Sequence, residues 1–290
     1  MKYHKTVLLK EAIENLKVRS EGTYVDCTLG EAGHSLEILK ELGPKGKLLS
    51  IDRDEEVIDF VKKHFKKELE ERKNWTIKKG NFKDIKKLLE NEGIKKVDGF
   101  LMDLGLSSRQ LEASNRGFSY LEGSQDLDMR MDPSLNAKAL DLLKFYDEKT
   151  LGRIIWEFGE EKNARKIAKF IKQDIEKIHN VEDLNQIILR AVPAAHRDNF
   201  KHPSRRVFQA LRIAVNDELE NLQKGLEESF EILKEEGRLV VISFHSLEDR
   251  IVKKFFKTKT KEKNKPILPT PEEIEENPRG RSAKMRVLIK

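Results

Sequence analysis

Short apolar runs alternate with longer amphipathic segments between Thr23 and Leu106. The apolar runs predict strands at Tyr24–Thr28, Lys47–Ile51, Trp75–Lys79 and Val97–Leu104. After the second run, Val57, Ile58, Val61 and Phe65 recur at helical spacing, and Asp54 suits the start of that helix. Strands that alternate with helices are typical of a parallel sheet with crossover helices. We therefore expect an α/β fold, with a Rossmann-like sheet that begins as a βαβαβαβ half.

The pattern changes after this half. Residues 107–133 are rich in Ser, Gly, Asp and Arg, which predicts a long loop, and residues 136–192 have a helical pattern. An apolar stripe in this region, read as core, consists of Ile167, Ala168, Phe170, Ile171, Ile175 and Ile178. From Ser204 we expect one long helix, whose apolar face consists of Phe208, Leu211, Val215, Leu219 and Leu222. The following helical stretch is expected to end at Gly237.

Two further strands are predicted, at Arg238–Ile242 and at Met285–Ile289, the last one antiparallel at or near an edge. The chain of 290 residues is long enough for two domains. We predict a sheet domain formed by residues 1–108 and 204–290. Residues 109–203 would form an inserted, mainly helical domain that recognises or covers a substrate.

Composition narrows the class of protein. Charged residues make up 37% and aromatic residues 7% of the chain, as expected for a globular enzyme. The sequence contains no apolar run long enough for a membrane span and no secretory signal, so we expect a cytoplasmic protein without a membrane partner. The single cysteine, Cys27, excludes an internal disulfide and is expected to pack in a strand. The scattered histidines predict no metal site.

The positive charge is unevenly distributed. Residues 253–290 contain 12 basic and 5 acidic residues, whereas the net charge of the whole chain is +6. Clustered lysines and arginines bind phosphates, so this segment suggests a polyanionic partner. A solvated lysine-rich tail would explain the same charge.

The segment DCTLGEAGHS, Asp26 to Ser35, lies between the first predicted strand and a helix. Gly30 and Gly33 allow a tight turn and a close approach to a ligand, and Asp52 ends the next strand where a carboxylate can accept both ribose hydroxyls. These features together predict nucleoside binding; a tight turn beside a surface aspartate is the alternative. Neither GxGxxG nor GxxxxGK[ST] occurs, so nothing indicates a dinucleotide or a triphosphate.

Further candidates follow the third and fourth strands. Phe82 could face an adenine ring, although an isolated Phe is more often core. Asp103 begins the segment DLGLSSRQL at the carboxyl end of its strand, where open α/β sheets bind ligands, unless it only caps the loop. His245 follows the predicted strand Arg238–Ile242 and faces the same edge.

Four polar clusters combine Arg, His, Ser and Phe. They are RGFS (116–119), DLDMRMD (126–132), HPSRR (202–206) and SFHSLEDR (243–250). Arginine forks suit phosphates and aromatic rings suit bases, which favours RNA contacts for these clusters. Each cluster alone could be ordinary loop chemistry.

Together these motifs closely resemble the MraW family of bacterial small-subunit ribosomal RNA methyltransferases. The likeness also includes the blocks YHKTVLLKE (3–11), FGEEKNARKIA, HPSRRVFQALRIAVNDELE, GRLVVISFHSLEDRIVK and NPRGRSAKMRV, so it extends nearly from end to end. The resemblance implies N4-methylation of one cytidine in the decoding centre of 16S rRNA, on an assembled small subunit. S-adenosylmethionine would be the methyl donor and S-adenosylhomocysteine the product.

The resemblance also implies a set of cofactor contacts. These are Ala32, Gly33, His34, Asp52, Phe82, Asp103 and Gln110, in addition to Gly30, which the turn itself indicates. Family members usually have a GxGGH turn, and here Ala32 replaces the middle glycine, a change that a negative φ would tolerate. For catalysis we expect Asp103, or a backbone carbonyl of residues 104–107, to accept a hydrogen bond from N4 of cytosine. Ser107, Ser108 and His245 would shape the base pocket.

Three rival interpretations differ from this one. An RNA chaperone or assembly factor could keep the nucleoside site without catalysis, and an enzyme of the same fold could methylate a protein or DNA amine. A nicotinamide-dependent oxidoreductase fits least, because the glycine fingerprint is absent. The sequence leaves the choice between monomer and homodimer open.

Overall fold

The computed structural model describes residues 5–112, 114–193, 202–261 and 264–290. The chain divides into two compact units, residues 1–107 with 219–290 and residues 108–218. The first two residues of the block YHKTVLLKE lie outside the described residues. No described helix is long and apolar enough to cross a membrane.

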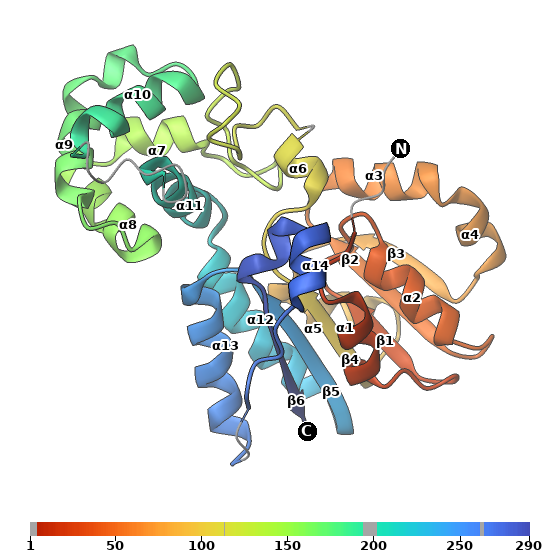
Figure 1. Ribbon diagram of the computed structural model, residues 1–290. Coiled ribbons are helices and arrows are strands. Elements are labelled where there is room, and N and C mark those ends of the chain that lie inside the picture. Colours follow the sequence, from red (N-terminus) through yellow and green to blue (C-terminus); the bar gives the residue numbers. More distant parts are fainter. Residues whose placement is uncertain (1–4, 113, 194–201, 262–263) are drawn as a thin grey trace. The chain divides into compact units, whose positions relative to one another are not determined.

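A six-stranded sheet forms the centre of the first unit. Its strands are β1 (Thr23–Asp26), β2 (Lys47–Asp52), β3 (Trp75–Lys79), β4 (Val97–Asp103), β5 (Leu233–Ser243) and β6 (Lys284–Ile289). The order is β3-β2-β1-β4-β5-β6, parallel except for β6, which pairs antiparallel with β5 at the edge (Figure 1). The predicted α/β class, the parallel sheet and the antiparallel final strand are therefore confirmed.

Helices cover both faces of this sheet. The first group is α1 (Leu9–Leu16), α2 (Gly33–Glu41), α3 (Glu55–His64) and α4 (Lys66–Glu71), and the second is α5 (Ile85–Asn91), α12 (Glu218–Ile232) and α13 (Ser246–Lys259). Leu16, Ile38 and Ile58 of the first group share one apolar core. Leu89, Leu226 and Phe256 of the second group belong to a separate core. The alternating residues of each strand supply both cores, because successive side chains point to opposite faces.

Shorter elements complete the first unit. They are η1 (Phe82–Asp84), α14 (Pro271–Glu276) and η5 (Pro278–Ser282). Asp54 begins α3 as expected, because its side chain accepts a hydrogen bond from the Glu56 amide. Cys27 lies just beyond the end of β1 and not in the strand as expected. It is nevertheless buried, which agrees with the predicted packing role, and burial raises the pKa of its thiol well above the usual value.

The second unit is helical. It contains α6 (Ser108–Glu112), α7 (Ala139–Phe145), α8 (Glu148–Gly159), α9 (Ala164–Gln173), η2 (Ile175–Lys177), α10 (Val181–Ala191) and α11 (Pro203–Asn216). The predicted apolar stripe lies in its core, with Ile167, Ala168, Ile171 and Ile178 fully buried. The loop expected over residues 107–133 contains one helix that the pattern did not predict, α6.

The helix expected from Ser204 through Leu222 is two helices, so this prediction was wrong. Asp217 ends α11 in the left-handed conformation at a φ of 49°, and α12 follows. α11 packs against α8, where the Gln209 side chain donates to the Phe158 carbonyl, and it belongs to the second unit. The unit boundary therefore lies after residue 218, whereas the sequence pattern places it at residues 203–204.

Gly237 does not end a helix as expected. α12 ends at Ile232, and β5 begins at the next residue, so Gly237 lies inside the strand. The pairing of β5 with β4 shifts register between Val97 and Gly99, close to the left-handed Glu236 at a φ of 61°. A Cβ atom on Gly237 would lie 2.7 Å from the Lys234 carbonyl oxygen, so the close approach of the backbone beside this bulge explains why a glycine occurs here.

Candidate active site

Three aspartates end three adjacent parallel strands of the first unit. Asp26 ends β1, Asp52 ends β2 and Asp103 ends β4. The strand order places β1 between β2 and β4, so the three carboxyl ends lie at one edge of the sheet (Figure 1). This is the edge at which open α/β sheets bind ligands.

The turn after β1 has the left-handed backbone that a close turn requires. Gly30 has a φ of 49°, and its amide donates to Asp52 Oδ2 at 3.1 Å. Ala32 also lies in the left-handed region, at a φ of 67°, so the negative φ that would accommodate its methyl group is not present. The side chain of Ala32 is fully buried in the core beneath the turn.

Gly33 allows a close contact of a different kind from the predicted one. A Cβ atom at this position would lie 1.9 Å from Thr6 Oγ1. The glycine therefore makes room for the segment that leads into α1, whereas the sequence suggested only an approach to a ligand. The N-terminal block of the chain thus packs directly on the glycine turn.

Asp52 connects the turn to the start of α3. Its carboxylate accepts the amides of Gly30 and Asp54, one on each oxygen. Burial raises the pKa of Asp52 to about 6, against the opposing effect of these two amides. A carboxylate oxygen can accept more than one hydrogen bond, so both oxygens keep lone pairs for two vicinal hydroxyls.

A buried chain of hydrogen bonds lies behind the turn. Ser35 Oγ donates to Asp26 Oδ2 at 2.6 Å and lies 2.8 Å from Ser50 Oγ, which also accepts from Trp75 Nε1 at 2.9 Å. Asp26 in turn accepts the amide of Thr28, whose Oγ1 accepts the amide of Asp103. The chain connects β3, β2, α2, β1 and β4, and burial raises the pKa of Asp26. Sequence reasoning missed this chain.

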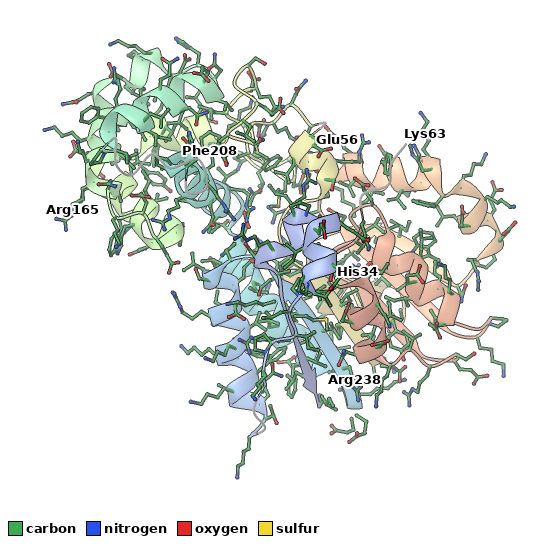
Figure 2. The ribbon with its side chains drawn as sticks, in the orientation of Figure 1. His34, Glu56, Lys63, Arg165, Phe208 and Arg238 are labelled. Carbon is green, nitrogen blue, oxygen red and sulfur yellow. The ribbon has the colours of Figure 1, made fainter. Side chains whose placement is uncertain are left out.

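Asp103 and His34 form the centre of the site. His34 lies at the start of α2 (Figure 2), and its Nδ1 is 3.7 Å from Asp103 Oδ2. Burial lowers the pKa of His34 to about 4, so its imidazole is neutral near pH 7. Burial, with the negative charges of Asp26 and Glu248, raises the pKa of Asp103 well above its usual value. This contact is consequently not an ion pair.

Two polar atoms of this pair have no partner within the described residues. Asp103 Oδ1 and His34 Nε2 are both buried and make no hydrogen bond. Leaving such atoms unsatisfied is unfavourable, typically by about 1–3 kcal/mol each. A ligand with polar groups at this edge would satisfy them.

Phe82 begins η1 directly after β3, and its ring packs against α12. A Cβ atom on Gly225 of α12 would lie 2.5 Å from the Phe82 ring. The residue is half-buried and borders the core beneath it. The structure thus gives Phe82 a packing contact, and the predicted adenine contact stays a prediction.

Ser107 and Gln110 lie on either side of the unit boundary. Ser107 is the last residue of the first stretch of unit 1, and Gln110 lies on α6 of unit 2, where it is buried. The role of Gln110 at the cofactor stays a prediction. The same holds for Ser107 at the base pocket.

His245 has a structural role that the sequence analysis did not predict. Its Nδ1 accepts the Glu248 amide at the start of α13, and the Glu248 carboxylate accepts the amides of Phe244 and His245. This reciprocal arrangement is a capping box. Its sequence signal, an acid three residues after the cap, was present in the chain. The structure therefore explains the position of His245 without a substrate.

The four polar clusters make contacts within the protein, and their expected contacts with RNA stay a prediction. Arg116 Nη1 donates to the carbonyls of Arg130 and Met131, and Arg130 pairs with Asp128 through Nε at 2.7 Å. His202 caps α11 and stacks on Tyr120. These contacts hold the loop after α6 and the start of α11 in place.

The alternative explanation of the basic segment 253–290, a solvated tail, does not hold for the described residues. They include the end of α13, α14, η5 and β6, and Arg286 of β6 is buried against Asp249 of α13 at 2.7 Å. Lys284 pairs with the same carboxylate, and Lys290 Nζ donates to the Phe230 carbonyl. Part of the basic charge therefore stabilises the sheet edge.

The sheet order with its antiparallel final strand and the left-handed turn after β1 are those of a Rossmann-like α/β domain of the methyltransferase type. Residues 1–290 match the model of the MraW methylase family. Ribosomal RNA small subunit methyltransferase H of Brevibacillus brevis is 42% identical over 99% of this chain and 98% of its own length. The protein of the same name from Clostridium botulinum is 44% identical, again over 99% and 98%. The chain belongs to the MraW methylase family.

A solved structure agrees with the fold. A provisionally named rRNA-methylase from Clostridium thermocellum superposes with a TM-score of 0.50 at 12% identity, over 99% of both chains. At this identity the likeness shows the fold alone.

Proposed function

We propose that this protein transfers a methyl group from S-adenosylmethionine to N4 of one cytidine in the decoding centre of 16S rRNA. The substrate would be the assembled small ribosomal subunit in the cytoplasm. Full-length relatives named for methylation of small-subunit ribosomal RNA support the substrate class. One observation of the structure supports the chemistry. At the sheet edge, the carboxyl group of Asp103 lies beside the neutral imidazole of His34, and its buried Oδ1 atom has no hydrogen-bond partner among the described residues.

The residues present fit the proposed cofactor. Asp52 offers carboxylate lone pairs to the ribose hydroxyls, and the turn at Gly30 brings backbone close to the same edge. His34 Nε2 and Asp103 Oδ1 offer two buried polar atoms in need of partners. When bound, the cofactor supplies an electrophilic methyl group. Ala32, Gly33, Phe82 and Gln110 complete the proposed contacts.

Asp103 would act on the acceptor amine. The N4 lone pair of cytosine is delocalised into the ring, so the amine must be oriented and must lose one proton as its new bond to carbon forms. A carboxylate whose pKa is raised by burial is a stronger base than an ordinary aspartate. Asp103, or a carbonyl of residues 104–107, would accept this hydrogen bond, with Ser107 and His245 shaping the pocket. A base must leave its stack to reach this position.

The direct test uses isotopically labelled S-adenosylmethionine with small subunits that lack the modification. The RNA is digested and the labelled nucleoside is identified by mass spectrometry. Labelled N4-methylcytidine is the expected product. Cofactor binding without any labelled product would favour an assembly factor, and label on a protein or on DNA would move the protein to another substrate class.

Asp103→Asn tests the role of the carboxyl group. We expect methylation to fall by at least about a hundredfold, the usual size of a general-base effect. Since burial and neighbouring negative charges disfavour the carboxylate, the variant should be at least as stable as the wild type at pH 7. Thermal unfolding checks this point, so that lost activity is not mistaken for lost structure. Undiminished methylation with unchanged cofactor affinity would remove Asp103 from the mechanism.

A further inference from the structure

The exposed face of α13 differs from the other helix surfaces of the first unit. From Arg250 to Lys261 the sequence RIVKKFFKTKTK contains six basic residues and no acidic residue. Lys253, Lys254 and Lys257 of α13 are all exposed, and so is Lys261, which lies two residues beyond the helix end. We call these four residues the α13 lysine face. Among the described residues, no carboxylate lies within ion-pairing distance of any of them.

Elsewhere in the first unit, exposed lysines are commonly paired. Lys66 and Lys67 of α4 face Glu70 and Glu71, each pair at 3.8 Å. Lys224 of α12 contacts both Asp84 and Glu228. Glutamate is abundant in this chain, so its absence from two turns of α13 is not explained by composition.

This arrangement is unfavourable for the helix itself. Arg250 and Lys254, and Lys253 and Lys257, are like charges at i and i+4 of α13, which repel one another on a helix surface. Cations near the carboxyl end favour the helix dipole, but Lys253 and Lys254 lie in its middle. A repulsive face that folding does not require suggests a partner of opposite charge.

The α13 lysine face has a rigid support. Val252 and Phe256 are buried in the core under the helix, on the side away from the lysines. The pair between Asp249 and Arg286 fixes the helix to β6. Lys259 is engaged separately, since its Nζ lies 4.8 Å from the Phe230 ring centroid. The face therefore presents fixed charges, which is what recognition of a regular polyanion needs.

α13 also starts at the edge that holds the candidate active site. Ile242 of β5 pairs with Asp103 of β4, and the capping residue His245 follows three positions later. Lys253 and Lys257 then follow about 6 Å apart along the helix, given a rise of 1.5 Å per residue, and Lys261 lies just beyond the helix end at Lys259. The row runs away from the reacting edge, as the backbone of a bound nucleic acid would on either side of the target base.

We infer that the α13 lysine face binds the phosphate backbone of the ribosomal RNA that flanks the methylated base. This inference rests on the proposed function and adds a docking surface to it. The lysines neutralise phosphates without reading sequence, so they contribute affinity and its salt dependence, and they do not touch the reacting atoms.

The test compares two triple variants that change the net charge equally. One is Lys253→Gln, Lys254→Gln and Lys257→Gln, and the control is Lys63→Gln, Lys66→Gln and Lys67→Gln on α3 and α4, where Figure 2 labels Lys63. Methylation of small subunits is measured with labelled S-adenosylmethionine, and binding to the same subunits is titrated at several salt concentrations.

We expect the α13 variant to raise KM for the subunit roughly tenfold while kcat and cofactor affinity stay unchanged. The slope of log K against log salt should shrink by about 2–3, near one per phosphate contact. The control variant should change both values little. Unchanged KM and salt slope in the α13 variant, or an equal effect in the control, would overturn the inference.

Failure of the proposed function gives a different result. If the wild-type protein methylates no RNA but its binding to small subunits still depends on the α13 lysines, the docking surface stands and the reaction assignment fails. A third variant with arginine at the same three positions, Lys253→Arg, Lys254→Arg and Lys257→Arg, keeps the charge. It should bind small subunits like the wild type whether or not the protein methylates RNA. If it does not, the role of these lysines is not electrostatic and the inference fails.

Discussion

Asp52 should make cofactor binding depend on pH. Its folded pKa of about 6 lies above the usual value, so the carboxylate is ionised above pH 6 and gains a proton below it. A protonated carboxyl loses acceptor capacity for the ribose hydroxyls. We therefore expect cofactor affinity to be constant above about pH 7 and about tenfold weaker at pH 5.

Calorimetric titration between pH 5 and 8 checks this expectation. Asp52→Asn should bind more weakly throughout and lose the pH dependence, while circular dichroism at pH 5 controls for unfolding. A wild-type affinity that does not change between pH 5 and 7 would mean that Asp52 does not hold the cofactor.

Ala32 shows how two opposing terms cancel at one residue. Its left-handed backbone costs an alanine about 1–2 kcal/mol, whereas its buried methyl group contributes about 0.8 kcal/mol and restricts the unfolded chain. Ala32→Gly should therefore change the free energy of unfolding by less than about 0.5 kcal/mol. The control is Ala12→Gly, a buried alanine in α1, which should destabilise by about 1.5–2 kcal/mol.

Urea unfolding of the two variants measures both values. A loss at Ala32 as large as the loss at Ala12 would show that the left-handed backbone is not strained by the methyl group. A large gain at Ala32 would instead show that burial of the methyl group contributes little.

At the scale of elements, Ser35 connects helix α2 to strands β1 and β2. Ser35→Ala removes the hydrogen bond to Asp26 and one neighbour of Ser50. Hydrogen bonds to charged groups contribute about 1.5–3 kcal/mol, so we expect a loss of about 2 kcal/mol and weaker cofactor binding through the displaced turn. The control is Ser229→Ala in α12, because Ser229 Oγ is buried without a hydrogen-bond partner among the described residues.

Trp75 reports on the same chain of hydrogen bonds. Its indole donates to Ser50, while the other tryptophan, Trp156, is exposed in the second unit. In a Trp156→Phe background, Ser35→Ala should change the emission of Trp75, and Ser229→Ala should not. Equal stability and equal emission in the two serine variants would mean that this chain of hydrogen bonds does not support the turn after β1.

Elements were predictable where the pattern of apolar residues determines the outcome. The run Val97–Leu104 matches β4 to within one residue, because a strand that is buried along nearly its whole length leaves a clear apolar signal. The break at Asp217 left no such signal, since the apolar face continues across it while one backbone angle changes sign. The prediction at Gly237 was wrong because the signal is ambiguous. A glycine occurs at bulges in strands as well as at helix ends.

The candidate site was predictable only in part. Asp52 and Asp103 were found because strand ends are visible in the sequence, and both lie at the expected edge. The contact between Ser35 and Ser50 was not, because two serines on separate elements carry no mark of their meeting. Arg286 was misread as free charge, since a sequence does not show that its carboxylate partner lies on the neighbouring helix.

At the scale of the whole molecule, the basic side chains fall into a paired group and an unpaired group. Cations at the sheet edge are paired and hold β6 to α13, whereas the α13 lysine face is unpaired among the described residues. Net charge alone, at +6 for 290 residues, would not have distinguished these two groups. The distinction matters because only unpaired cations are available to release counterions from a polyanion.

The first unit is built from both ends of the chain, and this constrains how the protein forms during synthesis. Strand β4 emerges from the ribosome more than a hundred residues before its neighbour β5, and the second unit emerges between them. The helices of unit 2 contact mainly one another and can fold as soon as they appear. Strands β1 to β4 must wait with one edge open until β5 and β6 arrive. Translation speed over residues 108–218 thus sets how long an unpaired strand edge is exposed to aggregation in the cell.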